Sequence, residues 1–542
     1  MRFFAEYLPG PSLRAALRPA AAAAVVVCGL AAGPAAATQV TAFKQAVAES
    51  ASDDPVLSQF YREQGYAPIW VADEADDRAR RAAFLSVVAK APMHGLPAGR
   101  YDAATIKRLL ASARSERDRG RIEVELSRLL LRFARDLETG ILTPARVVPD
   151  IKRTVPLRDG VEVLTEFAGT RPHEFLRSLT PGSAEYTRLA REKLALERAI
   201  AQGGWGVRLP EGRIEPGQSG PRVVALRDRL TAMGYLRLSA TQVYDDAMRR
   251  AVEAFQSDHG LTPDGVVGGA TLIELNRGPD HRLGQVLVAM ERERWLNRDL
   301  GERHIWVNLT DFKARIVDRG EVTFETRSVI GKDEAGRETP EFSDEMDHMV
   351  INPSWYVPRS IVVNEYLPVL RRNPGALSYM QITDSRGRTV GRSRGFSQYT
   401  ARTFPYAMRQ PPGPRNALGT VKFMFPNKYN IYLHDTPAKN LFSREVRAFS
   451  HGCVRLNDPH DFAYTLLAAQ EADPEGFFQR ILRSGRETRV NMETPLPVHL
   501  VYRTAYTKPE GGMQYRRDVY ARDSRILAAL RRAGVVITVG GS

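Results

Sequence analysis

The spacing of hydrophobic and polar positions changes along the chain, and the first long stretch has a helical period. Between residues 45 and 205, apolar positions recur every three or four residues with charges between them, as in "RIEVELSRLLLRFARDLETG" and "YTRLAREKLALERAIA". This period is typical of amphipathic helices. We therefore expect a helical domain over 45–205, interrupted by turns at "FYREQGYAPIWV" and "APMHGLPAGRYD". It contains no cluster of catalytic residue types.

A second, shorter helical pattern follows a stretch rich in glycine and proline. Residues 203–221 have no periodicity and predict a linker. After it, "PRVVALRDRLTAMGYL" and "DDAMRRAVEAFQSDHG" predict two amphipathic helices, the second capped by Asp245 or Asp246. With "LTPDGVVGGATLIELN", these residues resemble the small three-helix peptidoglycan-binding domain. Its core would include five apolar residues: Val224, Leu226, Leu230, Val252 and Phe255.

From about residue 303 the pattern alternates as it does in strands. "HIWVNLTDFKARIVDRG", "EVTFETRSVIG", "MDHMVINPSWYVP", "GTVKFMFPN" and "YNIYLHDTP" are separated by short turns. They predict a β-rich domain over 303–500, with an insertion over 358–412 that we interpret as a cap or lid. The tail, 501–542, carries a short strand, a basic segment and an amphipathic helix. The fold class is thus multidomain α+β.

The first 37 residues are expected to direct export. Arg2, Arg14 and Arg18 precede a short apolar run, and "AAA" lies just before Thr38, which is typical of a signal peptide. An uncleaved anchor is the alternative, but the run is shorter than the roughly 20 residues that span a bilayer. We expect a mature protein in the periplasm or cell envelope.

Length and charge narrow the partners. A chain of 542 residues, 43% hydrophobic and 26% charged, predicts about three or four soluble domains. The net charge of +14 favours contact with something anionic. An exported protein rarely meets nucleic acid, and Arg and Lys are scattered, so an acidic envelope polymer or a membrane surface fits better. The alternative interpretation is that the positive charge only keeps the protein soluble.

The cysteine content points to a reactive thiol. Removing the signal peptide removes Cys28 and leaves Cys453 without a partner in the chain, so the thiol is either reactive or bridged to another molecule. A catalytic thiol needs a nearby base, and His434 and His451 are the candidates. Gly452 would leave its own amide and that of Cys453 free for a developing oxyanion.

Arg455, two positions after the thiol, fits either a substrate carboxylate or a structural salt bridge. No HExxH, paired CxxC or tetrahedral ligand spacing is present, so we expect neither a metal nor another cofactor.

A longer motif adds a family resemblance. His434, fifteen further residues and then "SHGCVRLND" resemble the signature of the L,D-transpeptidase (YkuD-type) catalytic domain, and "NPSWYVP" and "NALGTVKFMFP" resemble its upstream strands. The order of helical scaffold, peptidoglycan-binding unit and catalytic domain with an inserted cap resembles the large periplasmic members. "LSQFYREQGYAPIW" and "HGLPAGRYD" look like their scaffold domain.

The resemblance implies a role for each residue of the motif. Cys453 would be the nucleophile and His434 its base, with the other ring nitrogen held by a backbone carbonyl. His451 would support the base or the oxyanion. Substrate contacts and loop order would come from the remaining candidates: Ser450, Arg455, Asn457 and Tyr432.

The implied reaction joins two peptidoglycan stem peptides. Cys453 would attack the third residue of a tetrapeptide, meso-diaminopimelate, release D-alanine and hold the stem as a thioester. An amine of a second stem would then give a 3→3 cross-link, while water would give carboxypeptidase activity and a protein lysine would give tethering. Carbapenems are expected to trap the thiol, and other cell-wall synthesis proteins are possible partners.

Two alternatives belong to other classes. The first is a non-catalytic peptidoglycan-binding scaffold, which is favoured because two of the units need no chemistry. The thiol and both histidines argue against it, because such a scaffold would not need them. A cell-wall cysteine endopeptidase usually has its cysteine ahead of its histidine in the sequence. Here His434, the presumed base, comes first.

Overall fold

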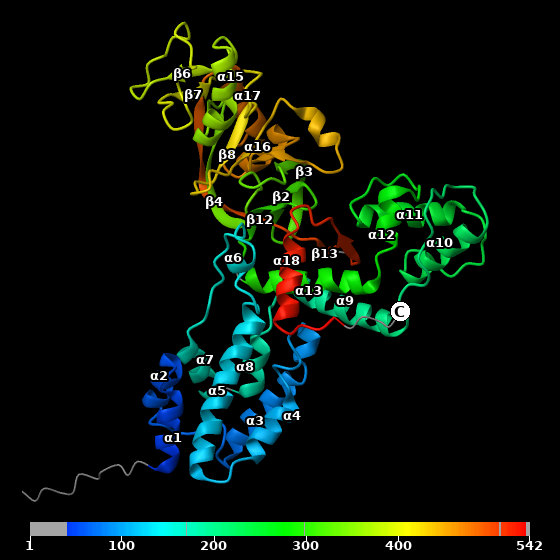
Figure 1. The fold of residues 1–542 in the computed structure, drawn as a ribbon, viewed down its shortest axis with the longest axis vertical. Coiled ribbons are helices and arrows are strands. Elements are labelled where there is room, and N and C mark those ends of the chain that lie inside the picture. The colour runs from blue at the N-terminus through cyan, green and yellow to red at the C-terminus, as the bar shows by residue number, and fades with distance from the viewer. Residues whose placement is uncertain (1–40, 170, 298, 509–510, 538–542) are drawn as a thin grey trace, which may run out of the picture.

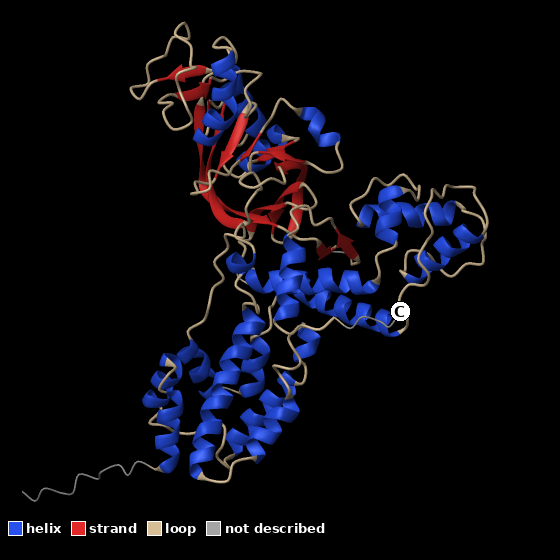
Figure 2. Cartoon of the chain, viewed as in Figure 1, coloured by secondary structure: helices blue, strands red, loops and turns tan. Residues whose placement is uncertain are grey.

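A computed structural model describes residues 41–537, except for 170, 298, 509 and 510. The predicted signal peptide and Cys28 lie outside these residues. The N-terminal helical domain is at one end of the molecule and a β-barrel domain at the other, with a middle layer of helices between them and a three-helix unit at the side (Figure 1). Figure 2 shows that the strands are confined almost entirely to the barrel end.

The N-terminal helical domain is built around one long central helix, α5 (Glu116–Glu138). Glu123 on this helix is buried and accepts hydrogen bonds from the backbone amides of Ile69, Trp70 and Val71, which fixes the loop around the buried Trp70. The other helices of this region are α1 (Ala42–Ala51), α2 (Pro55–Glu63), α3 (Ala75–Val88), η1 (Ala91–His94), α4 (Ala103–Ala111), α6 (Pro144–Val147), α7 (Gly160–Gly169) and α8 (Pro172–Ser178).

The middle layer consists of three helices that are far apart in the sequence. α9 (Ala184–Ala201) packs along α13 (Pro279–Trp295), and α13 also contacts α18 (Arg522–Arg532). Because α13 is buried nearly throughout, its charged residues are buried as ion pairs, such as Arg294 with Glu291 at 3.0 Å. A helix enclosed on all sides lacks the one-sided pattern that the sequence analysis relied on.

The three-helix unit contains α10 (Pro221–Ala232), α11 (Asp246–Asp258) and α12 (Gly269–Leu275). Asp245 is the cap of α11 and accepts a hydrogen bond from the Met248 amide. Val223, rather than the predicted Val224, belongs to the core. Residues 203–221, predicted as a linker, contribute Leu209 and Ile214 to the same core, because apolar residues in a loop give no periodic signal.

The barrel is one sheet with the order β10-β3-β11-β9-β8-β4-β12-β1-β2, and β2 also pairs with β3, which closes the ring. Its interior is filled by a core of apolar side chains. Helices α16 (Pro459–Leu467) and α17 (Pro474–Arg483) and the 3-10 turn η3 (Lys439–Ser443) connect the later strands. The strands are β1 (Arg303–Asn308), β2 (Lys313–Asp318), β3 (Glu321–Gly331), β4 (Phe342–Ile351), β8 (Val421–Met424), β9 (Leu433–His434), β10 (Ala448–Ser450), β11 (Val454–Leu456) and β12 (Thr488–Val501).

The insertion forms a cap with a small core of its own. Its three-stranded sheet has the order β5-β7-β6, with β5 (Trp355–Tyr356), β6 (Gln381–Thr383) and β7 (Ala407–Gln410). A continuous helical segment precedes β6 and consists of α14 (Arg359–Ile361), the π-helical turn η2 (Val362–Tyr366) and α15 (Leu367–Arg372). The tail adds the hairpin β13 (Ala505–Thr507) and β14 (Met513–Tyr515) before α18.

The predicted multidomain α+β fold, helical first and β-rich afterwards, is confirmed. Among the described residues no helix is both long enough and apolar enough to cross a bilayer.

Candidate active site

Two neighbouring strands carry the predicted nucleophile and base to one face of the barrel wall. β11 runs parallel to β9, with Val454 opposite Leu433 and Arg455 opposite His434. Leu433 and Val454 point into the barrel core. Because side chains alternate along a strand, His434 and Arg455 point outward, and Tyr432 and Cys453, two positions earlier, lie on that outer side as well.

A third strand extends this row of side chains. β8 pairs with β9 so that Lys422 lies opposite His434. The Lys422 ammonium lies 5.9 Å from the centre of the Tyr432 ring. Positive charge therefore accumulates beside the thiol from Lys422 on one strand and Arg455 on another.

The outer face opens into a cavity of about 780 Å³ that we call the catalytic cavity. The cap forms much of the opposite wall with a stretch from Trp355 to Tyr366. Of the eight predicted site residues, six line the catalytic cavity: Tyr432, His434, Ser450, His451, Cys453 and Arg455. Gly452 and Asn457 do not line it.

His434 is buried and its ring is fixed in one orientation. Its Nδ1 lies 2.5 Å from the Asp435 carbonyl oxygen, so Nδ1–H donates there and Nε2 is left as the basic nitrogen. Burial, with the nearby Arg455 charge, lowers the pKa of His434 to about 3. The ring is therefore neutral at neutral pH, and its Nε2 carries no proton.

The Cys453 thiol is neutral as well. Burial raises its pKa to about 11, although hydrogen bonding from the Tyr432 amide and hydroxyl and the charges of Arg455 and Lys422 act in the opposite direction. Its Sγ lies 3.5 Å from the Asn430 carbonyl oxygen, which accepts a hydrogen bond from the thiol. A resting thiol and imidazole, rather than a preformed ion pair, are the states that these pKa values predict.

The loop before the thiol has one position that only glycine fits. Gly452 has φ +116°, and a Cβ there would lie 3.1 Å from Ile431 Cδ1. Its amide donates to Ser450 Oγ at 3.1 Å, and that hydroxyl donates to the Cys453 carbonyl oxygen at 2.5 Å. The expectation that both amides are free is thus wrong for Gly452. The Cys453 amide has no hydrogen-bond partner among the described residues.

The carbonyl oxygen of Gly452 accepts a hydrogen bond from a residue that the sequence analysis missed. Thr339 is fully buried, and its Oγ1 donates to the Gly452 carbonyl oxygen at 2.7 Å while accepting from the Gly331 amide at 2.8 Å. Tyr520 from the tail donates to the Gly331 carbonyl oxygen at 2.5 Å. The tail therefore supports the catalytic loop through Tyr520.

The two histidines of the motif have different surroundings. His451 is 38% exposed in its side chain, and its Nε2 lies 2.8 Å from Glu365 Oε1, on the cap. The same oxygen accepts a hydrogen bond from Arg337 Nη2 at 2.8 Å. His451 thus connects the catalytic loop to the cap, whereas the buried His434 has the fixed ring that a base needs.

The two remaining candidates also differ. Arg455 makes no ion pair with a carboxylate among the described residues, and its buried Nε has no hydrogen-bond partner there. This favours a substrate carboxylate over a structural salt bridge. Asn457 instead donates to Asp458 Oδ1 at 2.7 Å and orders the chain after β11. Its position does not support a contact with substrate in the catalytic cavity.

Four residues of the site carried no signal that the sequence analysis used. Each lies at least 31 positions from Cys453 and reaches the site only through barrel closure, cap placement or tail packing: Thr339, Glu365, Lys422 and Tyr520. In the described part of the chain, no group of three or more His, Cys, Asp and Glu side chains is placed to hold a metal ion.

Models of known families match three segments. Residues 302–491 match the L,D-transpeptidase catalytic domain, YkuD. Residues 55–192 match a scaffold domain, and residues 219–275 match a "putative peptidoglycan binding domain". The three matches correspond to the barrel with its cap, most of the N-terminal helical domain, and the three-helix unit.

Individual relatives are more distant. A "putative L,D-transpeptidase" of Haemophilus influenzae is 31% identical over 224 residues, which make up 41% of this chain and 45% of that protein. An L,D-transpeptidase structure from Xylanimonas cellulosilytica is 18% identical and covers 54% of this chain and 98% of its own, with a TM-score of 0.16. A mutant L,D-transpeptidase from Enterococcus faecium is 12% identical and covers 57% and 99%, with a TM-score of 0.18. These TM-scores are low, so the two structures add nothing to the family matches.

Proposed function

Because the chain belongs to the L,D-transpeptidase family, carrying its YkuD catalytic domain with a scaffold and a peptidoglycan-binding domain, we propose that it forms 3→3 peptidoglycan cross-links. The observation that carries the proposal is the outward face shared by β9 and β11. There Cys453, His434 and Arg455, which has no carboxylate partner among the described residues, line one cavity under the cap.

The first half of the reaction acylates the thiol. His434 Nε2 takes the Cys453 proton as the sulfur attacks the carbonyl carbon of meso-diaminopimelate in the tetrapeptide stem. The C–N bond to D-alanine breaks, the amine leaves with the proton from His434, and the stem remains as a thioester. Arg455 binds a carboxylate of the donor, and the Tyr432 hydroxyl and amide stabilise the thiolate as it forms.

Thr339 positions the donor that stabilises the tetrahedral intermediate. The Gly452 carbonyl and the Cys453 N–H belong to one planar trans peptide and point in opposite directions. Thr339 holds the carbonyl on the buried side, so the Cys453 amide, which has no partner among the described residues, points the other way. In that direction it donates a hydrogen bond to the oxyanion. Thr339 is a positioning residue and touches neither substrate nor thiol.

The second half transfers the stem to an acceptor amine. The amine attacks the thioester, the sulfur leaves as thiolate, and the proton returns to Cys453 through His434. The cap excludes water from the thioester, and Glu365, paired with His451 and Arg337, holds it over the catalytic cavity. With water as acceptor the same site would release a tripeptide, and with a protein lysine it would tether that protein.

The catalytic and peptidoglycan-binding domains support a location in the cell envelope, with peptidoglycan as the partner. We propose that residues 1–37 direct its export.

Muropeptide products test the proposed function. The protein is incubated with purified disaccharide-tetrapeptides, and products and intact protein are analysed by mass spectrometry. We expect free D-alanine, a thioester adduct on the parent protein but not on Cys453→Ala, and a 3→3 dimer. A protein that binds the muropeptides without forming the adduct would be a non-catalytic scaffold, and tripeptides without dimer would identify a carboxypeptidase.

A further inference from the structure

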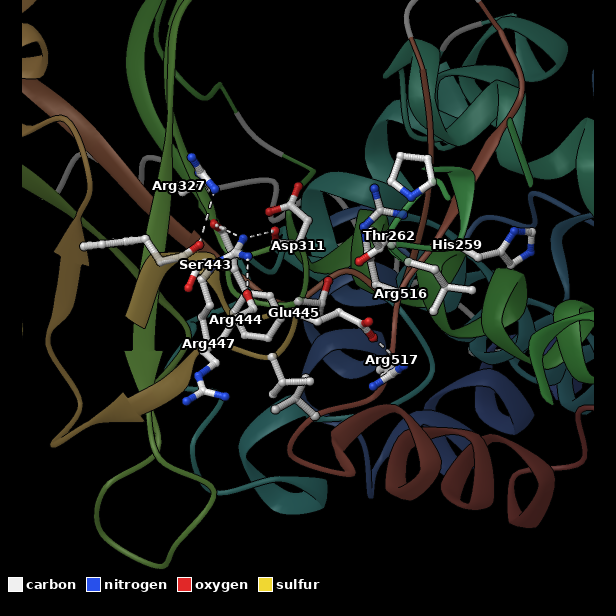
Figure 3. Close-up of a pocket in the computed structure, with 18 residues that line it drawn as sticks. His259, Thr262, Asp311, Arg327, Ser443, Arg444, Glu445, Arg447, Arg516 and Arg517 are labelled. Carbon is white, nitrogen blue, oxygen red and sulfur yellow. Dashed lines mark hydrogen bonds and ion pairs between the residues drawn. The ribbon is translucent and has the colours of Figure 1, made fainter. Parts of the chain in front are cut away.

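A second cavity lies where the three-helix unit, the barrel and the tail meet (Figure 3). This junction cavity measures about 230 Å³. The three-helix unit contributes residues 259–263, including His259 and Thr262, and the barrel contributes Arg327 and the segment 442–447. The tail contributes Arg516 and Arg517. None of these residues lines the catalytic cavity.

The positive charges of the junction cavity are largely uncompensated. Its two carboxylates are already paired, Asp311 with Arg315 at 2.8 Å and Glu445 with Arg517 at 2.5 Å. Within the described ranges, the four other arginines of the lining form no ion pair with a carboxylate: Arg327, Arg444, Arg447 and Arg516. Figure 3 shows Arg327, Arg444 and Arg447 on one side of the cavity and Arg516 on the other.

Two of these guanidinium groups are held in place mainly by backbone carbonyl groups. Arg447 donates to the carbonyl oxygens of Ser328 at 3.1 Å and Phe312 at 3.1 Å. Arg516 donates to those of Asp258 at 2.9 Å and Tyr515 at 2.7 Å. Carbonyl oxygens orient a guanidinium but leave its charge in place, and burial together with Arg327 lowers the pKa of Arg447 to about 10. A bound anion would relieve this repulsion.

The walls of the junction cavity are fixed to each other by contacts between the three-helix unit and the tail. Asp258 accepts hydrogen bonds from Lys508 Nζ at 2.6 Å and from the Gln514 amide at 2.6 Å. The His259 ring stacks on Tyr515 with centroids 5.4 Å apart. Because both partners of each contact are ordered before any ligand arrives, binding would require little rearrangement.

The junction cavity continues onto the surface of the three-helix unit. A neighbouring hollow of about 790 Å³, bordered by Gly268–Ile273, shares Leu261, Thr262 and Glu445 with it. A polymer lying in this hollow would therefore reach the arginines with the groups that project from it.

We infer that the junction cavity binds carboxylates of peptidoglycan stem peptides on a strand held by the three-helix unit. It is a binding site without chemistry, separate from the catalytic cavity. The inference rests on the proposed function for its choice of polymer. Stem peptides carry carboxylates at intervals along a glycan strand, which matches a cluster of uncompensated arginines beside a peptidoglycan-binding unit.

Cosedimentation with purified sacculi tests the inference with the full-length protein. Arg327 and Arg444 are exposed, so the pair R327Q/R444Q should fold normally, and we expect it to bind sacculi about tenfold more weakly than the parent, from the loss of two charge-assisted contacts. R516Q, on the opposite wall, should weaken binding in the same direction. Sacculi whose carboxylates have been converted to amides should bind the parent as weakly as native sacculi bind R327Q/R444Q.

The control removes the same charge elsewhere on the barrel domain. Arg483 and Arg486 are exposed and line neither cavity, so R483Q/R486Q should bind like the parent. Equal losses in both double variants, or full binding to amidated sacculi, would overturn the inference. If R327Q/R444Q bound sacculi like the parent but bound vesicles with anionic phospholipid more weakly, the inference would be overturned in favour of a phosphate ligand. Acylation of Cys453 by a soluble tetrapeptide should be the same in all of these variants, so this test and that of the proposed function can fail separately.

Discussion

The catalytic cavity and the junction cavity both present arginines that have no carboxylate partner among the described residues, yet only one of the two cavities contains groups that can react. In the catalytic cavity, Arg455 lies beside a thiol, a buried imidazole and an unpartnered backbone amide. In the junction cavity, the only histidine is His259, whose Nδ1 lies 2.7 Å from the Phe255 carbonyl oxygen and whose pKa is lowered well below its usual value by burial. Uncompensated positive charge therefore accounts for binding anions in both places.

The difference teaches what has to be added to an anion site before it becomes an active site. Chemistry requires a nucleophile, a base with a fixed tautomer and an oriented donor for the oxyanion. In the catalytic cavity the groups that we propose for these roles come from two paired strands and from a loop whose Gly452 carbonyl accepts a hydrogen bond from Thr339. The cap lines the catalytic cavity and contributes no residue to the lining of the junction cavity. The following predictions separate the two cavities.

Removing the base should have the largest effect. We expect His434→Ala to slow acylation of Cys453 by about 10³-fold, within the range for a general base, because the thiol proton loses its acceptor. Intact-protein mass spectrometry with a carbapenem or a tetrapeptide measures the rate. The matched variant His451→Ala should lose less than about tenfold, since His451 bonds to the cap. The reverse order would assign the base to His451.

The reactivity of the free thiol should follow its raised pKa. Thiolate is the reactive form, and its fraction rises about tenfold per pH unit below the pKa. With the pKa of Cys453 at about 11, alkylation by iodoacetamide should become about a hundredfold faster between about pH 7 and about pH 9. Peptide mapping locates the label. A plateau already reached near neutral pH would indicate a preformed thiolate-imidazolium pair instead.

Releasing the Gly452 carbonyl should weaken the oxyanion donor alone. We expect Thr339→Val to slow acylation by about 30-fold, less than the loss of a whole oxyanion donor. Alkylation of Cys453 by iodoacetamide should not change, because Thr339 does not touch the thiol. Thr339→Ser keeps the hydroxyl and should act like the parent. A parallel loss in alkylation would mean that the substitution disturbs the loop as a whole.

The two arginine sites should respond to different substrates. Arg455→Gln should raise the KM for a soluble tetrapeptide by about tenfold, since a charge-assisted contact is lost. A tetrapeptide whose C-terminal carboxylate is replaced by an amide tests which carboxylate Arg455 binds. If Arg455 binds the terminal one, the parent and Arg455→Gln should have the same KM for this substrate. R327Q/R444Q should leave this KM unchanged while weakening sacculus binding. If either variant impaired both readouts, the two cavities would not be independent.

Loosening the cap should have the smallest effect. Glu365→Gln removes the charge that pairs with His451 and Arg337. We expect the ratio of tripeptide to cross-linked dimer to rise by about threefold, because water reaches the thioester more often. Quantified muropeptide chromatography gives the ratio. Glu334→Gln, an exposed carboxylate that pairs with Arg337 but not with the cap, serves as the control.

Much of the fold could be predicted from the sequence because most segments report their own environment. The helical period over 45–205 and the alternating strands after 303 reflect one-sided burial, which the structure has. The exceptions are informative. α13 is buried on all sides and pairs its charges, and Leu209 and Ile214 enter a core from an aperiodic loop, so neither gave a readable pattern.

The candidate site could be predicted only where its residues are close in the sequence or belong to the family motif. Ser450, His451, Gly452, Cys453 and Arg455 lie within six positions, and the resemblance chose His434 over His451 as the base. What each of them contacts could not be read from spacing. The Gly452 amide was expected to be free, but the neighbouring Ser450 hydroxyl takes it once the loop turns.

The sequence alone determined the order of domains, the unpaired thiol, the motif around it and the excess of positive charge, because these are properties of composition and local spacing. Tertiary structure alone decided that Thr339 and Tyr520 support the catalytic loop, that Glu365 meets His451, and that four arginines from three separate segments share one cavity. The physical reason is that hydrogen bonds and ion pairs act over a few ångströms. Residues far apart in the chain can therefore interact only after barrel closure, cap placement and tail packing have brought them together.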